Sequence, residues 1–421
     1  MSKTMTSRER VIAALNFQET DRVPIDLGAT PSSGISAISY AQLKEHLGIK
    51  SGHTRIYDVV QFLAQPEDDI IDLLGVDVLD IGRAFNTEDS DWYDIEMPNG
   101  QTGQYPSWFK PVRGNDGSWN AYHEDGTLIA RMPKGAQFYD QTYFPWLEGY
   151  PQGRKAMEEA LDEAMDKVLW QKLVHSPWDH ASEPDFWKQL RDRTIKLKEN
   201  TDKALMVVAG SNLYEWGTFL RRMDNFLMDL YTDQENVSIL MELLMERHMK
   251  TLEKVCDAVG DVVDILRFGD DLGMDSGPFM GLDVYKNLFE DHRTRLCSYV
   301  HENSSMKTFL HTCGSVYQYI PSLIDSGIDI INPVQTNCRD MEPDKLKKEF
   351  GKDIVFWGGG ADPREILNRG TPEEIKEDVK RRLEIFAPGG GYVFNNIHNI
   401  MGEVPPENII AMFETAKEFR F

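Results

Sequence analysis

Eight short apolar runs, separated by stretches with helical patterning, constrain the fold of this 421-residue chain more than any other feature. Strands that are buried on both faces read as continuous apolar runs, and their alternation with helices predicts a parallel sheet. Eight such units predict an α/β protein, built as a single (β/α)8 TIM barrel. The runs begin at Val23, Val76, Ala204, Val262, Lys307, Ile328, Ile354 and Gly391, and helix-like stretches lie at 282–300, 316–325, 371–386 and 405–418.

A doubly wound sheet could use the same units, but no Gly-x-Gly-x-x-Gly motif follows the first run. We therefore expect one barrel domain over residues 1–421, with residues 87–200 inserted between its second and third strands. The first half of the insertion reads as turns and hairpins, and the second half, from Gly153 to Asn200, is helical and charged. An insertion with its own structure is typical of a lid or binding subdomain, although decoration without a role is the alternative.

Composition limits the partners and the compartment. The net charge of −24 argues against nucleic acid and anionic membranes, because phosphate binding relies on basic patches. The N-terminal segment lacks the apolar core of a signal peptide, and no apolar run is long enough to cross a bilayer. Four cysteines are too few for a disulfide scaffold in a chain of this length. These features predict a reduced, cytoplasmic protein in which a well-placed thiol is a candidate ligand or nucleophile.

Polar residues gather where the predicted strands end, which is where a barrel enzyme places its active site. Asp270 and Asp271 follow the fourth strand and Glu215 the third, and these carboxylates are our candidates for acid–base catalysis. The aspartates could instead be metal ligands or cap the next helix, and Glu215 could form a surface ion pair with a nearby arginine. The candidates for substrate binding are Asp26, Arg83, Tyr214, Trp216 and Arg221.

The stretch FLHTCGS ends the fifth predicted strand and places His311 and Cys313 two residues apart. Residues at this spacing on a strand point to the same face, and zinc binds both imidazole and thiolate. A catalytic zinc site needs a third protein ligand, which His398 or Cys338 could supply. The alternative is a buried cysteine that acts as a small hydrophobe beside a hydrogen-bonded core histidine.

Five segments resemble the uroporphyrinogen decarboxylase superfamily, and together they extend over nearly the whole chain. The resemblance implies a (β/α)8 barrel and one of two chemistries. One chemistry is the cofactor-free decarboxylation of a tetrapyrrole, and the other is corrinoid-dependent methyl transfer with a zinc-binding His-x-Cys…Cys pattern. The segments are TSRERVIAALNFQETDRVPID, GDDLGMDSGPFM, FLHTCGS, IDIINPVQ and VPPENIIAMFETA.

The residues favour the methyltransferase branch. After the first strand the chain reads DLGATPSSGIS, without the arginines that the decarboxylase uses for its polycarboxylate substrate. His311 and Cys313 match the methyltransferase pattern, but the position of its last cysteine holds His398. The resemblance therefore implies zinc on His311, Cys313 and His398, with Cys338 as the alternative third ligand. A His2Cys set is acceptable to zinc, and it makes the metal a stronger Lewis acid than a set with one more thiolate.

The sequence thus predicts a zinc-dependent methyltransferase that moves a methyl group from a small substrate to a corrinoid (cobalamin) carried by a partner protein. A methyl ether such as a methoxylated aromatic suits the aromatic-rich segment from Trp92 to Trp146 and the pair Tyr214 and Trp216, unless these rings only pack the insertion onto the barrel. Decarboxylation, methylcorrinoid:thiol methyl transfer and a non-catalytic binding role remain as alternatives. A homodimer is compatible with the sequence.

Overall fold

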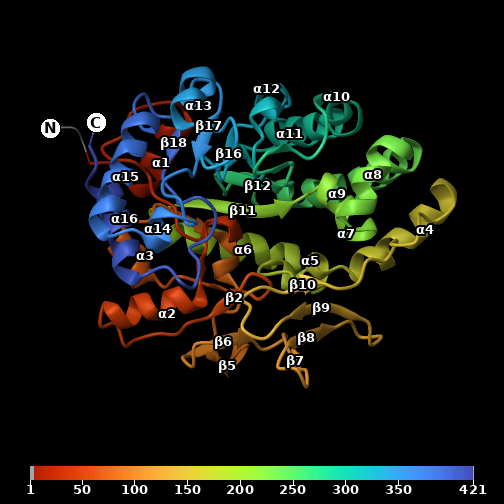
Figure 1. The fold of residues 1–421 in the computed structure, drawn as a ribbon, viewed down its shortest axis with the longest axis horizontal. Coiled ribbons are helices and arrows are strands. Elements are labelled where there is room, and N and C mark those ends of the chain that lie inside the picture. Colours follow the sequence, from red (N-terminus) through yellow and green to blue (C-terminus); the bar gives the residue numbers. More distant parts are fainter. Residues whose placement is uncertain (1–3, 421) are drawn as a thin grey trace.

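The computed structural model describes residues 4–420, and its centre is a curled parallel sheet of seven strands (Figure 1). The strands follow chain order around the sheet, and every neighbouring pair is parallel. They are β4 (Val78–Asp80), β11 (Ala204–Gly210), β12 (Ile265–Gly269), β15 (Lys307–His311), β16 (Ile330–Asn332), β17 (Val355–Trp357) and β18 (Tyr392–Val393).

The segment around Ile25 closes this sheet into a barrel. Ile25 forms a parallel bridge with Phe394, just beyond β18, and its carbonyl accepts a hydrogen bond of 2.8 Å from Asp77 N, just before β4. On the other side, Asp26 N donates to Phe394 O at 2.9 Å. All eight predicted runs therefore contribute to the barrel wall, and the predicted (β/α)8 fold is confirmed.

Helices surround the barrel, and one lies at the amino-terminal ends of its strands (Figure 1). The capping box predicted at Thr6 and Glu9 is present at the start of α1 (Ser7–Leu15), whose Val11 and Leu15 pack inside the barrel. The other covering helices are α3 (Asp68–Leu74), α9 (Gln234–Val259), α11 (Asp291–Asn303), α12 (Ile320–Asp325), α13 (Pro343–Phe350), α15 (Pro372–Phe386) and α16 (Pro406–Glu418). None of the helices within residues 4–420 is both long and apolar enough to cross a membrane.

The barrel interior changes character along its axis. The half at the amino-terminal ends of the strands is an apolar cluster that includes Ile265, Phe309 and Ile330. Two residues further along the same strands stand Arg267, His311 and Asn332, which share the inward face because side chains alternate along a strand. The carboxyl-terminal half of the barrel is therefore polar, and this is the end at which barrel enzymes bind substrate.

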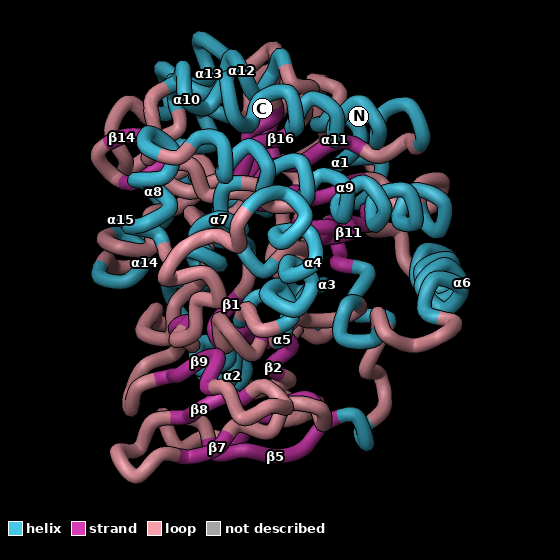
Figure 2. Tube along the Cα trace, turned by 90° about the vertical axis from the view of Figure 1, so that its right-hand side faces the viewer, coloured by secondary structure: helices cyan, strands magenta, loops and turns pink. Residues whose placement is uncertain are grey.

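The long insertion between β4 and β11 contains strands in its first half and helices in its second. In Figures 1 and 2 its strands form a layer beside the barrel, together with the small sheet of β1 (Ile35–Ser36), β3 (Leu63–Ala64) and β2 (Ile56–Asp58). Its elements are β5 (Trp92–Glu96), β6 (Thr102–Pro106), β7 (Val112–Arg113), β8 (Trp119–Tyr122), β9 (Leu128–Met132), β10 (Asp140–Gln141), α4 (Gly153–Asp166), α5 (Leu169–Lys172) and α6 (Phe186–Glu199).

Shorter elements decorate the loops at the carboxyl ends of the strands. The loop after β11 carries α7 (Tyr214–Arg221) and α8 (Met223–Thr232), and the loop after β12 carries a small hairpin and α10. The remaining elements are α2 (Ala37–His46), β13 (Gly273–Met274), β14 (Gly277–Pro278), α10 (Leu282–Tyr285) and α14 (Ile366–Arg369).

Candidate metal centre

His311, Cys313 and His398 form a cluster at the mouth of the barrel. One ligand atom from each lies within 4.8 Å of the other two. Cys313 Sγ is 3.4 Å from His311 Nε2, and the two imidazole ring centroids are 5.4 Å apart. Ligand atoms around a tetrahedral zinc are about 3.5 Å apart, so Cys313 Sγ and His311 Nε2 already have the spacing of two zinc ligands.

The orientation of the His311 ring is set by Asn332 on the neighbouring strand. The side-chain nitrogen of Asn332 donates to Trp357 O at 3.0 Å, so its oxygen faces His311 Nδ1 at 2.7 Å. His311 Nδ1 therefore carries the ring proton, and Nε2 turns its lone pair toward Cys313. A hydrogen-bond acceptor on the ring nitrogen that does not bind the metal is the usual means by which a protein orients a histidine ligand.

His398 lies in the loop after β18 with a backbone φ of 63°. Residues other than glycine are uncommon in this left-handed region, and they gather at functional sites. Its Nδ1 accepts a hydrogen bond of 2.9 Å from Asn399 N, so Nε2 carries the proton in the neutral ring. Metal binding through Nε2 therefore requires the other neutral tautomer, with the proton on Nδ1, and a change in the Asn399 contact.

Burial decides the charge of these three groups. It lowers the pKa of His311 to about 3, and it lowers the pKa of His398 to about 4, with His311 itself as a further cause. Both rings are thus neutral at pH 7, the form that binds a metal. Burial and the nearby Asp271 carboxylate raise the pKa of Cys313 well above its ordinary value. Its thiol keeps its proton unless a cation stabilises the thiolate.

The cluster borders a cavity of about 720 Å³ to which both histidines contribute. This volume lies within the range of small-molecule sites, which is about 300–1,000 Å³. Residues of the insertion and of α7 supply an aromatic wall, and the indole nitrogen of Trp178 is fixed by Val208 O at 2.6 Å. The aromatic lining residues are Trp170, Trp178, Trp187, Trp216 and Phe219.

Two of the predicted acid–base residues, Glu215 and Asp271, line this cavity. Asp271 Oδ1 accepts a hydrogen bond of 2.8 Å from Cys313 N and lies 3.5 Å from His311 Nε2. Glu215 Oε2 accepts from the side chain of Asn212 at 2.5 Å. Burial, with the nearby Asp271, raises the pKa of Glu215 to about 8. Glu215 is therefore mostly protonated at pH 7 and can donate a proton.

The structure does not bring Asp270 to the cavity. Its side chain is fully buried, and it accepts hydrogen bonds from Tyr214 N and Glu215 N at 3.2 and 3.0 Å. The guanidinium of Arg293, also fully buried, donates to it at 2.6 Å. Asp270 therefore anchors the first turn of α7 and positions Glu215 through its backbone N–H.

Of the five residues predicted to bind substrate, Trp216 lines the cavity. Tyr214 is buried, and its ring stacks on Phe279 with centroids 5.6 Å apart. Arg221 forms an ion pair of 2.8 Å with Asp229. Asp26 is buried inside the barrel, where it accepts from Trp357 Nε1 at 2.8 Å. Cys338, the alternative metal ligand, has its Sγ 3.4 Å from Asp275 Oδ1 and lies outside the cluster.

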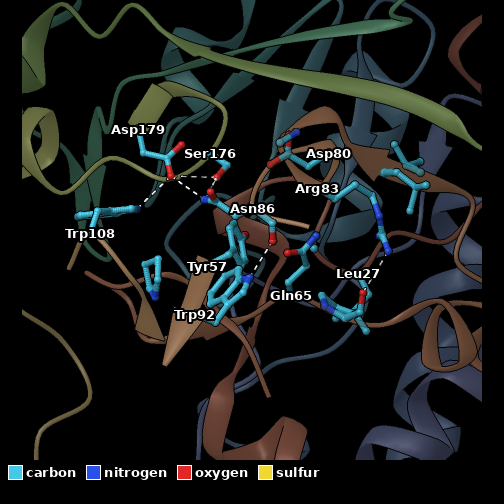
Figure 3. Close-up of a pocket in the computed structure, with 16 residues that line it drawn as sticks. Leu27, Tyr57, Gln65, Asp80, Arg83, Asn86, Trp92, Trp108, Ser176 and Asp179 are labelled. Atoms are coloured by element: carbon cyan, nitrogen blue, oxygen red, sulfur yellow. Dashed lines mark hydrogen bonds between the residues drawn. The ribbon is translucent and has the colours of Figure 1, made fainter. Parts of the chain in front are cut away.

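Arg83 borders a different, narrow pocket, which Figure 3 shows together with Asp80 and Tyr57. The pocket measures about 20 Å³, enough for roughly one water molecule. Arg83 donates to Asp68 Oδ1 at 2.7 Å and so already has an ionic partner. This pocket is too small for an organic substrate.

Sequence patterns did not single out Asn332, Arg267 or the tryptophans Trp170, Trp178 and Trp187. For the first two, a usable signal was present: Arg267 follows Ile265, and Asn332 follows Ile330, at the two-residue spacing of inward-facing strand positions. The tryptophans belong to the helical half of the insertion, and no local pattern told which of its faces meets the cavity.

A (β/α)8 barrel with a histidine–cysteine cluster at the carboxyl ends of its strands is an enzyme-like architecture, and comparison with known proteins identifies the family. Residues 200–419, just over half of the chain, match the family model described as uroporphyrinogen decarboxylase (URO-D). The chain belongs to this family, as its motifs predicted.

Similarity to individual relatives is partial. The uroporphyrinogen decarboxylase of Pseudoalteromonas translucida is 36% identical over 103 residues, which are 24% of this chain and 27% of that protein. The enzyme of the same name from Ruthia magnifica is 24% identical over 187 residues, or 42% of this chain and 52% of that protein. The matches thus span about a quarter to a half of these relatives.

A solved structure extends the likeness of fold to the whole chain. A methyltransferase from Methanosarcina mazei superimposes with a TM-score of 0.57, and the alignment covers 98% of this chain and 99% of that one. The sequence identity is 16%, so the comparison establishes a shared fold.

Proposed function

We propose that this protein is a zinc-dependent methyltransferase that moves a methyl group from a small methylated compound to a corrinoid carried by a separate protein. The observation that carries the proposal is the cluster of His311, Cys313 and His398 at the wall of a substrate-sized cavity. The name of the Methanosarcina mazei relative, a methyltransferase with the same fold, supports this choice within the family.

The donor set fits zinc. Two imidazoles and one thiol make three ligands, and catalytic zinc sites use three protein ligands with a fourth position open. His311 already directs the lone pair of Nε2 toward Cys313, because Asn332 holds the other ring nitrogen. When bound, the ion supplies Lewis-acid stabilisation of the oxygen that leaves as the methyl group is transferred.

The chain's own residues supply positioning and a proton. Asp271 fixes the Cys313 backbone through a hydrogen bond of 2.8 Å, so the thiol faces the cluster. Glu215 holds a proton at pH 7 and faces the same cavity, so it can protonate the leaving oxygen. The insertion residues that line the cavity supply an apolar wall beside the candidate metal ligands.

The cavity suits a methyl ether on an aromatic ring. Four tryptophans and a phenylalanine provide flat apolar surface, and the volume of about 720 Å³ accommodates a small ring compound. The same volume is small for a methyl donor together with a whole corrinoid, so we assign the cobalt nucleophile to a protein that docks at the barrel mouth.

Decarboxylation of a tetrapyrrole is the second candidate, favoured by the names of the family model and of the curated relatives. Such a substrate carries several carboxylates, which require several cationic partners. Two arginines and no lysine are among the described residues that line the cavity, and one of these arginines is paired with Asp162. This charge pattern favours methyl transfer.

Metal analysis combined with a methyl-transfer assay tests the proposal. We expect about one zinc per chain in the purified protein, and methyl transfer from a methoxylated aromatic to a reduced corrinoid protein, followed through the cobalt spectrum. His311→Ala, Cys313→Ser and His398→Ala should each lose zinc and activity, whereas Cys338→Ser should keep both. Retained zinc and unimpaired transfer in the first two variants would contradict the proposal, and CO2 release from a tetrapyrrole polycarboxylate would favour the second candidate.

A further inference from the structure

Arg267 brings a positive charge to the cavity wall without an ion-pair partner in direct contact, and the acidic groups of Glu215 and Asp271 act on it only from beyond 4.0 Å. Its side chain is half-buried, and its guanidinium makes one long contact, from Nη2 to Ser32 Oγ at 3.5 Å. Its Nε is buried and has no hydrogen-bond acceptor. Across residues 4–420, no carboxylate oxygen pairs with it within 4.0 Å. A guanidinium keeps its charge under all ordinary conditions, so an unpaired one in a cavity is costly.

The local structure makes room for this guanidinium. Arg267 is the third residue of β12 and pairs in register with Val208 on one side and Phe309 on the other. In strand register it lies opposite Phe309, two residues before His311, and its side chain extends along β12 toward Gly269. Gly269 lies two residues further on, and a Cβ there would come within 2.7 Å of Arg267 Nη1. Glycine at this position thus leaves the space that the guanidinium occupies.

The other charged groups of the cavity do not neutralise Arg267 by direct contact. Arg247, the second arginine of the lining, is held by Asp162 at 2.5 Å. Asp271 is engaged with the backbone of Cys313, and Glu215 with the side chain of Asn212. Of the four described histidines that line the cavity, His248, His311 and His398 are neutral at pH 7, because burial lowers the pKa of each. Among the described residues that line the cavity, the guanidinium of Arg267 is therefore the one without an ion-pair partner. It lies next to the aromatic wall and the candidate metal ligands.

We propose that Arg267, with the hydroxyl of Ser32, binds a carboxylate group of the substrate, so that the methyl donor is a methoxylated aromatic monocarboxylate. A guanidinium presents two parallel N–H groups that match the two oxygens of a carboxylate. A single unpaired arginine provides for one such group. This inference rests on the proposed methyl transfer for the role of the bound compound, but the binding itself is testable without the reaction.

A different role for Arg267 would be to stabilise the thiolate of Cys313, which shares its surroundings. The two roles make different predictions. Loss of a carboxylate partner weakens binding of the anionic compound alone, whereas loss of thiolate stabilisation lowers the zinc content and affects all compounds that approach the metal. Both quantities must therefore be measured on the same variants.

Binding of para-methoxybenzoate and of its neutral amide, para-methoxybenzamide, tests the proposal. Four of the nine tryptophans line the cavity, so quenching of tryptophan fluorescence reports occupation. We expect the purified protein, at pH 7, to bind the acid at least about tenfold more tightly than the amide. Arg267→Met should abolish this preference and leave amide binding unchanged, and Arg267→Lys should keep part of it.

Arg247→Met is the matched control, because it removes the other arginine of the same cavity, and it should retain the preference for the acid. Equal binding of acid and amide by the unaltered protein, or no binding of the acid, would overturn the proposal. So would an Arg267→Met variant that keeps the preference, or one that loses zinc and both compounds together.

The outcome is separable from that of the proposed function. The binding assay contains no corrinoid protein, and the zinc content of the same samples is measured independently. A protein that prefers the acid but holds no zinc and transfers no methyl group would contradict the proposed function alone. A protein that holds zinc and demethylates neutral ethers as well as acids would contradict the carboxylate site alone.

Discussion

Asn332 Oδ1 lies 2.7 Å from His311 Nδ1 and thereby fixes which nitrogen of His311 faces Cys313. The two residues occupy register-paired positions on β15 and β16, and both side chains point into the barrel. Asn332 is fully buried. The candidate metal centre thus depends on the strand pairing of the barrel as well as on the His-x-Cys spacing.

Removal of the Asn332 side chain should weaken zinc binding without removing a ligand. In Asn332→Ala the His311 ring loses the partner that holds its tautomer, and such changes typically cost about 10–100-fold in metal affinity. Competition with a zinc chelator measures this loss. Asn332→Asp keeps an acceptor at the same place and should retain more affinity than the alanine variant. An alanine variant with unchanged zinc affinity would show that Asn332 does not orient the ligand.

Breaking the buried pair between Asp270 and Arg293 should destabilise the protein. Both side chains are fully buried, so Asp270→Asn leaves an uncompensated guanidinium, at a cost of about 3–5 kcal/mol in the free energy of unfolding. Chemical denaturation measures this value. The double variant Asp270→Asn with Arg293→Met removes both charges and should recover much of the loss. A cost below about 1 kcal/mol in the single variant would argue against this role.

Methyl transfer should depend on a proton held by Glu215. Because its pKa is about 8, the acid form dominates at pH 7, and the rate should fall as the pH rises through about 8. In Glu215→Gln the rate should be low and lose this pH dependence. A rate profile of Glu215→Gln that matches the unaltered protein above pH 6 would contradict the assignment.

The same group predicts how stability changes with pH. Its pKa is raised on folding above the ordinary value of 4.5, so the folded state binds the proton more tightly than the unfolded state. Stability from this group is therefore present below pH 4.5 and is lost as the pH rises toward about 8. Glu215→Gln should remove this loss, and melting temperatures of the two proteins between pH 5 and 9 check it.

The barrel could be predicted from the sequence because its strands are buried on both faces and read as apolar runs. The first run was the least regular in the structure, since Pro24 removes a donor and Ile25 is left with a single bridge. The ligands His311 and Cys313 were found because both lie on one strand. His398 was one of two candidates for the third ligand, and the resemblance to a family was needed to favour it over Cys338, because it lies in a loop far along the chain.

The finer design of the site could not be predicted because it depends on contacts between distant segments. Asp270 and Asp271 are neighbours in sequence, yet one faces α7 and Arg293 while the other faces the cavity. Arg221 and Arg83 form ion pairs with Asp229 and Asp68, whereas Arg267 forms none within the described residues. Which charges stay unpaired is a property of tertiary packing, and strand alternation alone gives only the direction of each side chain.

Gly314, the residue after Cys313, should be indispensable for the position of the thiol. Its φ is 87°, and a Cβ there would lie 2.2 Å from the backbone of Gly273 in the β13–β14 hairpin. Gly314→Ala should therefore cost more than about 3 kcal/mol in the free energy of unfolding, because the hairpin or the strand end must move. Gly126 is the matched control, since its φ is 90° but it has open space around it. Gly126→Ala should cost only about 1–2 kcal/mol, the strain of the left-handed backbone. Denaturation curves measure both costs, and zinc content should fall in the Gly314 variant alone; equal costs with unchanged zinc would show that the close contact with Gly273 does not position Cys313.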